Sequence, residues 1–513
     1  MQPAPLRPAE DSSARRIGRV AAVALLAAAF AAPAAEPAPG PASAHARAPA
    51  PAGPLARAVR AELQRSGLDG SGIAAFYEAR DWRPLWLQGK ALRPEAHTVV
   101  ELLRRAELDG LDPGRHDPGA LSRALAAATA REPDALARAE VAISAALSGY
   151  VRDLRDAPEP ARMIFTDPAL AAPATEPDQI LAEAADAPDL SAHLATLMEG
   201  NPVYAELRRA LAELRAGRLE APHGHAERAQ QLLLANMARA RQIPADPGRR
   251  FVVVDAAGQQ LMLYEDGRLA ETMEVVVGQP RYATPMMAGV IRYAVFNPYW
   301  NVPVDLVRDD FARRVLRRGV SALEGERMEV LSDWSDQARP VDPATVDWAE
   351  VAAGRQLLRM RQRPGGDNMM GQVKLMLPNR LGIYLHDTPH RWAFDARQRT
   401  FSSGCVRLER ALPLARRLLG AAAPAALPSG AERRIDLPEP VPVFITYFTV
   451  WPEAGRLQAR ADPYGRDGPL LAAMADKAPA RRAQPGGLGG PVSHHAGDGK
   501  PSRQRGSRLT PIR

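Results

Sequence analysis

The first half of the chain carries its apolar residues at the spacing of amphipathic helices. From Leu55 to about Arg218 the sequence is rich in Ala, Leu, Arg and Glu, and the run from Ala135 to Ala157 repeats apolar positions with a helical period. These four residue types also favour helices individually, so local preference and pattern agree. The sequence therefore predicts an α-helical domain over residues 55–225.

The second half of the chain has strand-like patterning. Apolar residues alternate from Leu381 to Leu385, as they do in a strand with one buried face. Between residues 308 and 371, helical and irregular sequence interrupts the strand pattern, and Gly365 and Gly366 would allow this stretch to hinge. We therefore predict a mostly β domain over residues 226–470 with an insertion over 308–371, and a multidomain α+β architecture for the chain. Two domains also fit the length of 513 residues, since single cores stop growing near ~250 to 300 residues.

The two ends of the chain differ from both domains in composition. Arginines precede an apolar run from Val20 to Ala32, which is shorter than the ~20 residues that a membrane-spanning helix needs and is followed by small residues typical of signal cleavage. We predict a signal peptide over residues 1–35, with an uncleaved signal anchor as the alternative, and hence export. Residues 36–54 are Ala/Pro-rich and are predicted to be a linker. Residues 471–513 are predicted to be a disordered basic tail, because they are rich in Lys, Arg, Gly and Pro with few large apolar residues.

The formal net charge of +7 limits the classes of partner that the chain is expected to bind. A basic tail is compatible with nucleic acid, but the chain has no basic motif interleaved with aromatic residues. An exported protein meets anionic glycan and membrane surfaces instead. The sequence therefore predicts no nucleic-acid partner.

Cys405 is the candidate nucleophile. It is the only cysteine, so it cannot form an internal disulfide, and it stands in the polar run SSGCVR downstream of His386. A histidine beside a thiol lowers the pKa of the thiol by pairing with the thiolate. Gly404 would let the backbone turn so that successive N–H groups face the oxygen of a tetrahedral intermediate. The alternative is a cysteine packed as a small hydrophobe, which the turn-forming Ser-Ser-Gly context disfavours. The residues thus predict an acyl-transfer site.

The motifs around this pair resemble a known family. YLHDTP (Tyr384 to Pro389), followed after a polar loop by SSGCVRL (Ser402 to Leu408), is similar to the active site of the L,D-transpeptidases with the YkuD catalytic fold, most closely the YcbB-like branch. FYEARDWRPLW (Phe76 to Trp86) and AELDGLDP (Ala106 to Pro113) are similar, more weakly, to the scaffold domain of that branch. Further segments between residues 245 and 470 resemble the catalytic domain in order: FVVVDAAGQQLMLYEDGRL (251–269), VVVGQPRYATP (275–285), NPYWNVPVDLV (297–307), VKLMLPN (373–379), ITYFTVW (445–451) and DPYGRD (462–467).

Two positions depart from the commoner form of the family. Ser403 stands where many members have a second histidine, although the YcbB-like branch also has serine there, and Arg407 stands where many have asparagine. The chain also leaves no room for the peptidoglycan-binding module that the branch often inserts after the scaffold domain. The resemblance implies that the insertion at 308–371 is a lid over the cleft, the alternative being a surface excursion without a gating role.

The resemblance implies a peptidoglycan L,D-transpeptidase in the periplasm that forms 3→3 cross-links through a cysteine thioester, without a cofactor. Its partners would be stem peptides, a tetrapeptide donor and a diamino-acid acceptor, together with wall-synthesis proteins. Attachment of a protein to the wall, D-amino-acid exchange and L,D-carboxypeptidase hydrolysis stay open, as does a non-catalytic wall-binding scaffold. The predicted site residues are Cys405, His386 and Asp387 for catalysis, Ser403 and Gly404 for the oxyanion, and Tyr384, Ser402 and Arg407 for substrate binding. Either the carbonyl or the side chain of Asp387 would fix the tautomer of His386.

A zinc site is the competing interpretation of the same residues. His386, Asp387, His390 and Cys405 are all potential ligands. Two histidines four residues apart share one side of a helix, but Pro389 would break that helix and the residues before His386 alternate like a strand. The sequence therefore predicts no metal and a loop position for His390.

Overall fold

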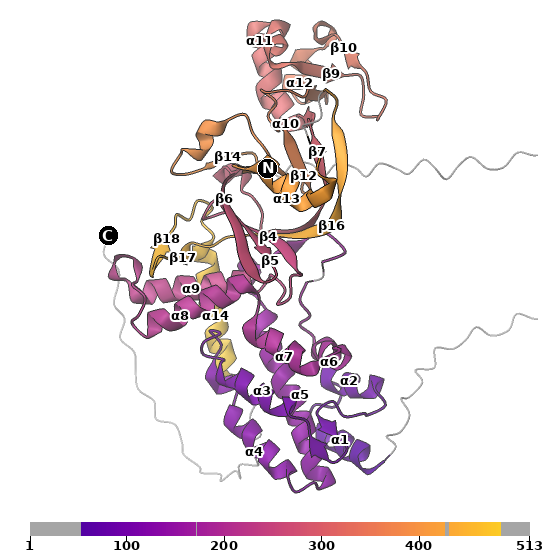
Figure 1. The fold of residues 1–513 in the computed structure, drawn as a ribbon, viewed down its shortest axis with the longest axis vertical. Coiled ribbons are helices and arrows are strands. Elements are labelled where there is room, and N and C mark those ends of the chain that lie inside the picture. The colour runs from indigo at the N-terminus through magenta and orange to yellow at the C-terminus, as the bar shows by residue number, and fades with distance from the viewer. Residues whose placement is uncertain (1–52, 171, 426–429, 484–513) are drawn as a thin grey trace, which may run out of the picture.

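A computed structural model describes residues 53–170, 172–425 and 430–483 of the chain. The predicted signal segment, nearly all of the predicted linker and the tail from residue 484 lie outside these residues. No helix among the described residues is both long and apolar enough to cross a membrane. Figure 1 shows the helical domain and the insertion at opposite ends of the long axis, with the main sheet between them.

The helical domain is built around α5 (Pro133–Arg155), the longest helix of the described residues. Its inner face buries Ala139, Ile143, Leu147 and Tyr150, each at most 1% exposed, at the spacing of one helix face. The prediction of an α-helical first domain is therefore confirmed. The other helices of the domain are α1 (Pro54–Arg65), α2 (Gly72–Ala79), α3 (Glu95–Arg104), α4 (Pro118–Ala128), α6 (Pro177–Asp186) and α7 (Leu190–Glu199), with a hairpin of β1 (Leu87–Gln88) and β2 (Ala91–Leu92).

The second domain is a ten-stranded sheet whose order is β12-β13-β15-β6-β5-β4-β16-β7-β3, with β14 pairing β6. β12 pairs both β13 and β7, so the sheet closes on itself. The mostly β second domain is confirmed. Its strands are β3 (Ile164–Phe165), β4 (Arg250–Asp255), β5 (Gln260–Glu265), β6 (Arg268–Gly278), β7 (Met287–Phe296), β12 (Val373–Met376), β13 (Leu385–His386), β14 (Thr400–Ser402), β15 (Val406–Leu408) and β16 (Arg433–Thr446).

Both faces of this sheet are covered, which explains continuous apolar runs such as that in β4. Val252 and Val254 pack in one core with α13 (Ala411–Leu419), whereas Phe251 and Val253 pack in another core with α8 (Pro202–Arg215) and α9 (Ala226–Ala240). The structure thus shows that α8 packs against one face of the sheet, although the sequence predicted that the helical domain continues to residue 225. Helix periodicity reports that a segment is amphipathic but not which neighbour covers its apolar face.

The insertion is a lobe with its own core and its own four-stranded sheet, in the order β10-β9-β11-β8. The backbone N–H of Asn297 donates to the carbonyl of Gln372 (3.0 Å), which joins the two ends of the lobe at a neck. The lobe therefore begins about ten residues before the predicted boundary at 308, because β8 pairs within the lobe instead of continuing the main sheet. Its elements are β8 (Trp300–Asn301), α10 (Val304–Leu306), a π-helix (Val307–Ala312), α11 (Arg313–Arg318), β9 (Met328–Leu331), β10 (Pro340–Val341), α12 (Trp348–Ala352) and β11 (Arg359–Gln362).

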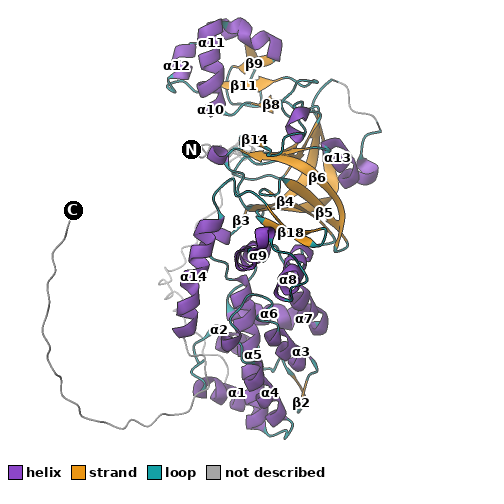
Figure 2. Cartoon of the chain, turned by 90° about the vertical axis from the view of Figure 1, so that its left-hand side faces the viewer, coloured by secondary structure: helices purple, strands orange, loops and turns teal. Residues whose placement is uncertain are grey.

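After β16 the chain forms a hairpin of β17 (Val450–Glu453) and β18 (Arg456–Ala459) and ends, among the described residues, in α14 (Asp467–Ala483). The prediction that the tail is disordered from residue 471 is wrong for its first part. Leu470 is fully buried, and Leu471 and Met474 pack beside it against small residues of α9 and of the segment after α5. Figure 2 shows α14 running beside α9. Three apolar residues on one helix face are enough to dock it, although the composition averaged over 471–513 hides the two of them that lie there, Leu471 and Met474.

Candidate active site

Two predicted site residues, His386 and Arg407, lie on one face of two paired strands. β13 and β15 run parallel, with Leu385 opposite Val406 and His386 opposite Arg407. Leu385 and Val406 are fully buried in the core beneath the sheet. Because successive side chains of a strand point to opposite faces, His386 and Arg407 point away from that core. Tyr384 and Cys405 come directly before these two strands, where the Val406 N–H donates to the Tyr384 carbonyl (3.2 Å).

The turn that carries Cys405 is held by Ser402 and Thr284. Ser402 Oγ accepts from the Gly404 N–H (3.1 Å) and donates to the Cys405 carbonyl (2.6 Å). Thr284 Oγ1 accepts from the Gly278 N–H (2.9 Å) and donates to the Gly404 carbonyl (2.8 Å). Gly404 has a φ of 114°, a conformation that an L side chain rarely adopts, as the sequence predicted for a tight turn.

This geometry changes two predicted roles. Ser402 is 2% exposed and its hydroxyl is bonded inside the turn, so it positions the nucleophile and does not face a substrate. The Gly404 N–H is also bonded, to Ser402, so it is not aimed at an oxyanion in this structure. Sequence could not reveal either bond, because a Ser-Ser-Gly run is equally compatible with outward-facing amides. The candidate oxyanion donors are then the N–H groups of Ser403, which the sequence predicted, and of Cys405.

The thiol of Cys405 rests against the segment that precedes β13. Its Sγ donates to the carbonyl of Gly382 (3.5 Å), and the backbone N–H and hydroxyl of Tyr384 both bond to the sulfur. Burial raises the pKa of Cys405 to about 11, although the Tyr384 N–H, the Arg407 charge and the Tyr384 hydroxyl oppose that rise. Burial also raises the pKa of the Tyr384 hydroxyl well above its usual range. Tyr384 therefore contacts the nucleophile itself.

The imidazole of His386 is buried and has a fixed tautomer. Its Nδ1 lies 2.5 Å from the carbonyl oxygen of Asp387, and since a carbonyl can only accept, Nδ1 carries the proton. This leaves Nε2 with the lone pair that a general base needs. Of the two alternatives left open for Asp387, the structure thus favours the carbonyl. Burial, followed by the charges of Arg407 and Lys374, lowers the pKa of His386 to about 3.

Taken together, these shifts make the resting pair a neutral thiol and a neutral imidazole. The sequence analysis expected a thiol whose pKa is lowered by the histidine; the structure instead gives a raised thiol pKa, because burial outweighs the nearby donors. The proton of Cys405 would then move to His386 only during attack on a bound substrate.

We expect the alkylation of Cys405 by iodoacetamide to keep accelerating about tenfold per pH unit above pH 8, because only the thiolate reacts and the thiol pKa is about 11. Arg407→Gln should slow alkylation further at pH 9, since it removes a cation that favours the thiolate. Arg355→Gln, in the insertion, is the matched control and should leave the profile unchanged. A rate that levels off below pH 8 in the unmodified protein would mean that a thiolate–imidazolium pair exists at rest.

Two cations flank the site. Arg407 lies beside His386 on β15, and its Nε is buried without a hydrogen-bond partner among the described residues. Lys374 lies opposite His386 on β12, where it pairs with Glu432 at 3.7 Å. Burial lowers the pKa of both side chains. A guanidinium whose Nε has no partner suits a carboxylate of a ligand at this position. Lys374 was missed by the sequence analysis, although it lies in the VKLMLPN segment.

The side chain of Asp387 ties the site to the neck of the insertion. Asp387 Oδ2 accepts from the Gln372 N–H (2.9 Å), and its other oxygen lies 3.7 Å from Arg391. Gly371 has a φ of 60° and a Cβ there would lie 2.4 Å from the Asp387 carboxyl group, so the position requires glycine. A movement of the insertion would therefore displace Asp387, the residue next to His386.

The C-terminal segment supports the nucleophile turn from outside. Tyr464 donates to the Gly278 carbonyl (2.8 Å), and Arg466 donates to the Thr284 carbonyl (2.9 Å). Tyr464 and Arg466 lie in the DPYGRD segment, and Thr284 lies in the VVVGQPRYATP segment. The sequence analysis singled out both segments but did not predict that they contact each other. Long-range pairing brings them together, and sequence spacing cannot report it.

Thr284→Val is expected to destabilise the protein by about 1 to 3 kcal/mol, because Thr284 is fully buried and the change leaves the Gly278 N–H and the Gly404 carbonyl without their partner. The loosened turn should also slow acylation of Cys405. Thermal unfolding and the acylation rate measure the two effects. Thr449→Val is the control: its hydroxyl is buried without a hydrogen-bond partner among the described residues, so it should cost much less.

His390 lies on the loop after β13, where its backbone N–H donates to Thr388 Oγ1 (3.2 Å), and its ring is beside Trp392 instead of the thiol. No group of three or more His, Cys, Asp or Glu side chains within the described ranges is arranged to hold a metal ion.

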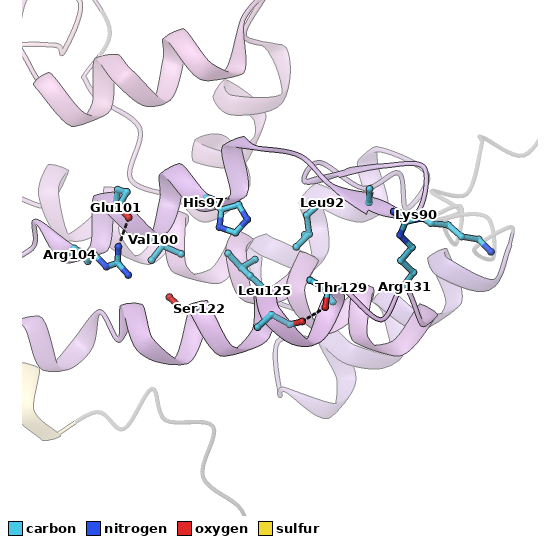
Figure 3. A pocket seen from close by; sticks show the side chains of 13 residues that line it. Lys90, Leu92, His97, Val100, Glu101, Arg104, Ser122, Leu125, Thr129 and Arg131 are labelled. Atoms are coloured by element: carbon cyan, nitrogen blue, oxygen red, sulfur yellow. Dashed lines mark hydrogen bonds and ion pairs between the residues drawn. The ribbon is translucent and has the colours of Figure 1, made fainter.

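A separate groove of about 450 Å³ lies in the helical domain between α3 and α4. Val100 and Leu125 lie between the two helices, and Lys90 and Arg131 lie at one end of the groove, as Figure 3 shows. Its lining includes none of the predicted site residues.

Comparisons with known proteins agree with these motifs. Residues 71–211 match a family described as a scaffold domain, and residues 249–444 match one described as an L,D-transpeptidase catalytic domain. A Haemophilus influenzae protein named "Putative L,D-transpeptidase" is 33% identical over 243 residues, which cover 46% of this chain and 48% of that protein. The chain thus matches about half the length of this curated relative.

Solved structures are similar at lower identity. An L,D-transpeptidase from Mycobacterium smegmatis is 11% identical, with a TM-score of 0.19, over 38% of this chain and 58% of that one. L,D-transpeptidase 3 from Mycobacterium tuberculosis, solved with a faropenem-derived adduct, is 14% identical, with a TM-score of 0.20, over 38% of this chain and 60% of that one.

Proposed function

The chain contains an L,D-transpeptidase catalytic domain preceded by a scaffold domain, and from this premise we propose that it forms 3→3 cross-links between peptidoglycan stem peptides through a cysteine thioester. The observation that carries the proposal is the common face of β13 and β15, which presents His386 and Arg407 side by side, with Cys405 and Tyr384 at the strand starts. Family membership supports acyl transfer in general, and this arrangement supports a thiol as the nucleophile.

In the first half of the reaction, Cys405 Sγ attacks the carbonyl carbon of the third residue in a donor tetrapeptide while its proton passes to Nε2 of His386. The carbonyl oxygen becomes an oxyanion, for which the N–H groups of Ser403 and Cys405 are the candidate donors. Collapse breaks the peptide bond, and His386 returns the proton to the departing amine of D-alanine. A thioester remains on Cys405.

In the second half, the side-chain amine of a diamino acid on another stem attacks the thioester carbonyl. His386 takes a proton from that amine, and the thiol leaves and regains its proton as the new amide forms. The base needs its Nε2 unprotonated, which the low pKa of His386 ensures.

Arg407 would bind the terminal carboxylate of the donor stem. Its unpartnered Nε and its place beside His386 support this role. Because the charge of Arg407 lowers the pKa of His386, a bound carboxylate would offset that charge and make the imidazole a stronger base. Substrate binding would then switch on the proton transfer that the neutral resting pair lacks.

The periplasmic location, the signal segment and the role of the insertion as a lid belong to the same proposal. A lid is supported by the separate core of the insertion and by its bond to Asp387 at the neck. Reaction with carbapenems is likewise part of the proposal, since a strained β-lactam ring acylates a nucleophile of this kind.

The proposal is tested by incubating the purified chain with disaccharide-tetrapeptides and analysing the products by mass spectrometry. We expect free D-alanine together with a dimer joined between two third residues. D-alanine without a dimer would favour L,D-carboxypeptidase hydrolysis, and incorporation of an added D-amino acid would favour exchange. Absence of D-alanine release and of any β-lactam adduct at Cys405 would support a non-catalytic scaffold and reject the proposal.

A further inference from the structure

Two exposed aromatic side chains touch each other beside the nucleophile turn. Trp392 is 58% exposed and Phe401 is 37% exposed, although most large apolar side chains of the domain are buried. Their ring centroids lie 5.4 Å apart with the planes tilted by 53°. The pair forms a small apolar surface that the fold itself leaves unused.

The surface stands on a fixed base. Trp392 belongs to a 3-10 turn (Arg391–Phe394) whose next two residues, Ala393 and Phe394, are 0% and 9% exposed and pack against Val276 of β6. Arg391 lies over the Phe394 ring at 4.7 Å and donates to the carbonyl of Glu409 (2.7 Å). With its neighbours anchored on both sides, the turn holds the Trp392 ring toward solvent.

The same surface is within reach of the chemistry. Both rings lie on the segment that joins His386 to Cys405, and Phe401 precedes Cys405 by four residues, which span at most ~14 Å. In a stem peptide, the reacting third carbonyl is separated from the sugar that carries the stem by three residues, or at most ~11 Å. The two spans are of similar size, so a sugar attached to a reacting stem is within reach of this surface.

The chemistry of the rings selects the ligand. The face of a pyranose ring presents polarised C–H groups, which pack against the electron-rich face of an aromatic ring. Two partly exposed side chains are too few for a stable protein interface, which buries about 800 Å² on each partner. An anionic ligand would need a free cation, whereas Arg391, the cation of the same turn, already contacts Asp387 and the carbonyl of Glu409.

We propose that Trp392 and Phe401 form an aromatic platform that stacks on a pyranose ring of the glycan strand whose stem peptide is being processed. The inference rests on the proposed function for its substrate class and adds a subsite for the sugar. It gives the chain a contact with the glycan within the catalytic domain.

The test compares two donors, the disaccharide-tetrapeptide and the free tetrapeptide. Trp392→Ala is expected to raise KM for the disaccharide-linked donor about tenfold, which corresponds to about 1.4 kcal/mol, and to leave the free tetrapeptide within twofold. Phe401→Ala should do the same to a smaller extent, and Trp392→Tyr should restore most of the loss. Leu269→Ala, at an exposed apolar residue elsewhere on the sheet, is the matched control and should change neither donor.

A binding measurement separates this inference from the proposed function. Glycan strands freed of their stems should quench tryptophan fluorescence of the chain, and the quenching should disappear in Trp392→Ala. Glycan binding without transpeptidation would reject the proposed function and keep the platform. Equal losses with both donors, no loss with either, or quenching that survives Trp392→Ala would overturn the platform.

Discussion

Cys405→Ala is expected to abolish D-alanine release and dimer formation, with a loss of at least ~10⁴-fold, as is found when a catalytic nucleophile is removed. The thiol is the atom that would carry the acyl group, and no other cysteine exists in the chain to replace it. The activity is measured on disaccharide-tetrapeptides and the β-lactam adduct by intact mass.

The fold should survive this change. Cys405 is half-buried at the end of a turn held by Ser402 and Thr284, so removing its sulfur leaves those bonds intact. Cys405→Ser should be nearly as inactive, since a hydroxyl is a much weaker nucleophile at neutral pH. An alanine variant that kept most of its cross-linking while its melting temperature was unchanged would remove Cys405 from the mechanism.

His386→Gln is expected to slow acylation of Cys405 by about 10² to 10⁴-fold, the usual contribution of a general base. The amide of glutamine is not basic enough to take the thiol proton. Because the pKa of the thiol is about 11, only a small fraction of Cys405 is thiolate at neutral pH without a base. Single-turnover acylation by a β-lactam, followed by mass, reports this step directly.

His390→Gln is the matched control for the base. Both histidines lie on the segment after β12, but the His390 ring faces Trp392 and the His386 ring lies on the strand face next to Arg407. The control should acylate at close to the normal rate. Equal losses in the two variants would mean that the two histidines act together, and sensitivity of both to a chelator would revive the zinc interpretation.

The insertion is tied to the site at its neck and not at the predicted hinge. Gly365 and Gly366 lie between β11 and β12. The hydrogen bonds that tie the insertion to the site are instead made by Asn297, Gln372 and Asp387. A sequence interruption marks where an insertion lies, but its ends are defined by which strands pair. The boundary predicted at 308 was late for that reason.

Local sequence was sufficient to predict the two kinds of domain and to identify the residues whose side chains are chemically reactive. Helical periodicity depends on neighbours three and four residues apart, and the turn around Gly404 depends on the backbone conformation of that glycine. Both could therefore be predicted from short stretches of sequence. The motifs at His386 and Cys405 were recognisable for the same reason. Their roles as base and nucleophile are still predictions, which the variants above test.

Tertiary structure decided everything that depends on residues far apart. It brought Lys374 and Arg407 to either side of His386 and joined Thr284 to the nucleophile turn. It also made the resting thiol and imidazole neutral, because the pKa of each group depends on burial and on charges contributed by other strands. Sequence determined which groups are present in this site; strand pairing and burial, which no local pattern encodes, determined their charge, their partners and the direction in which they point.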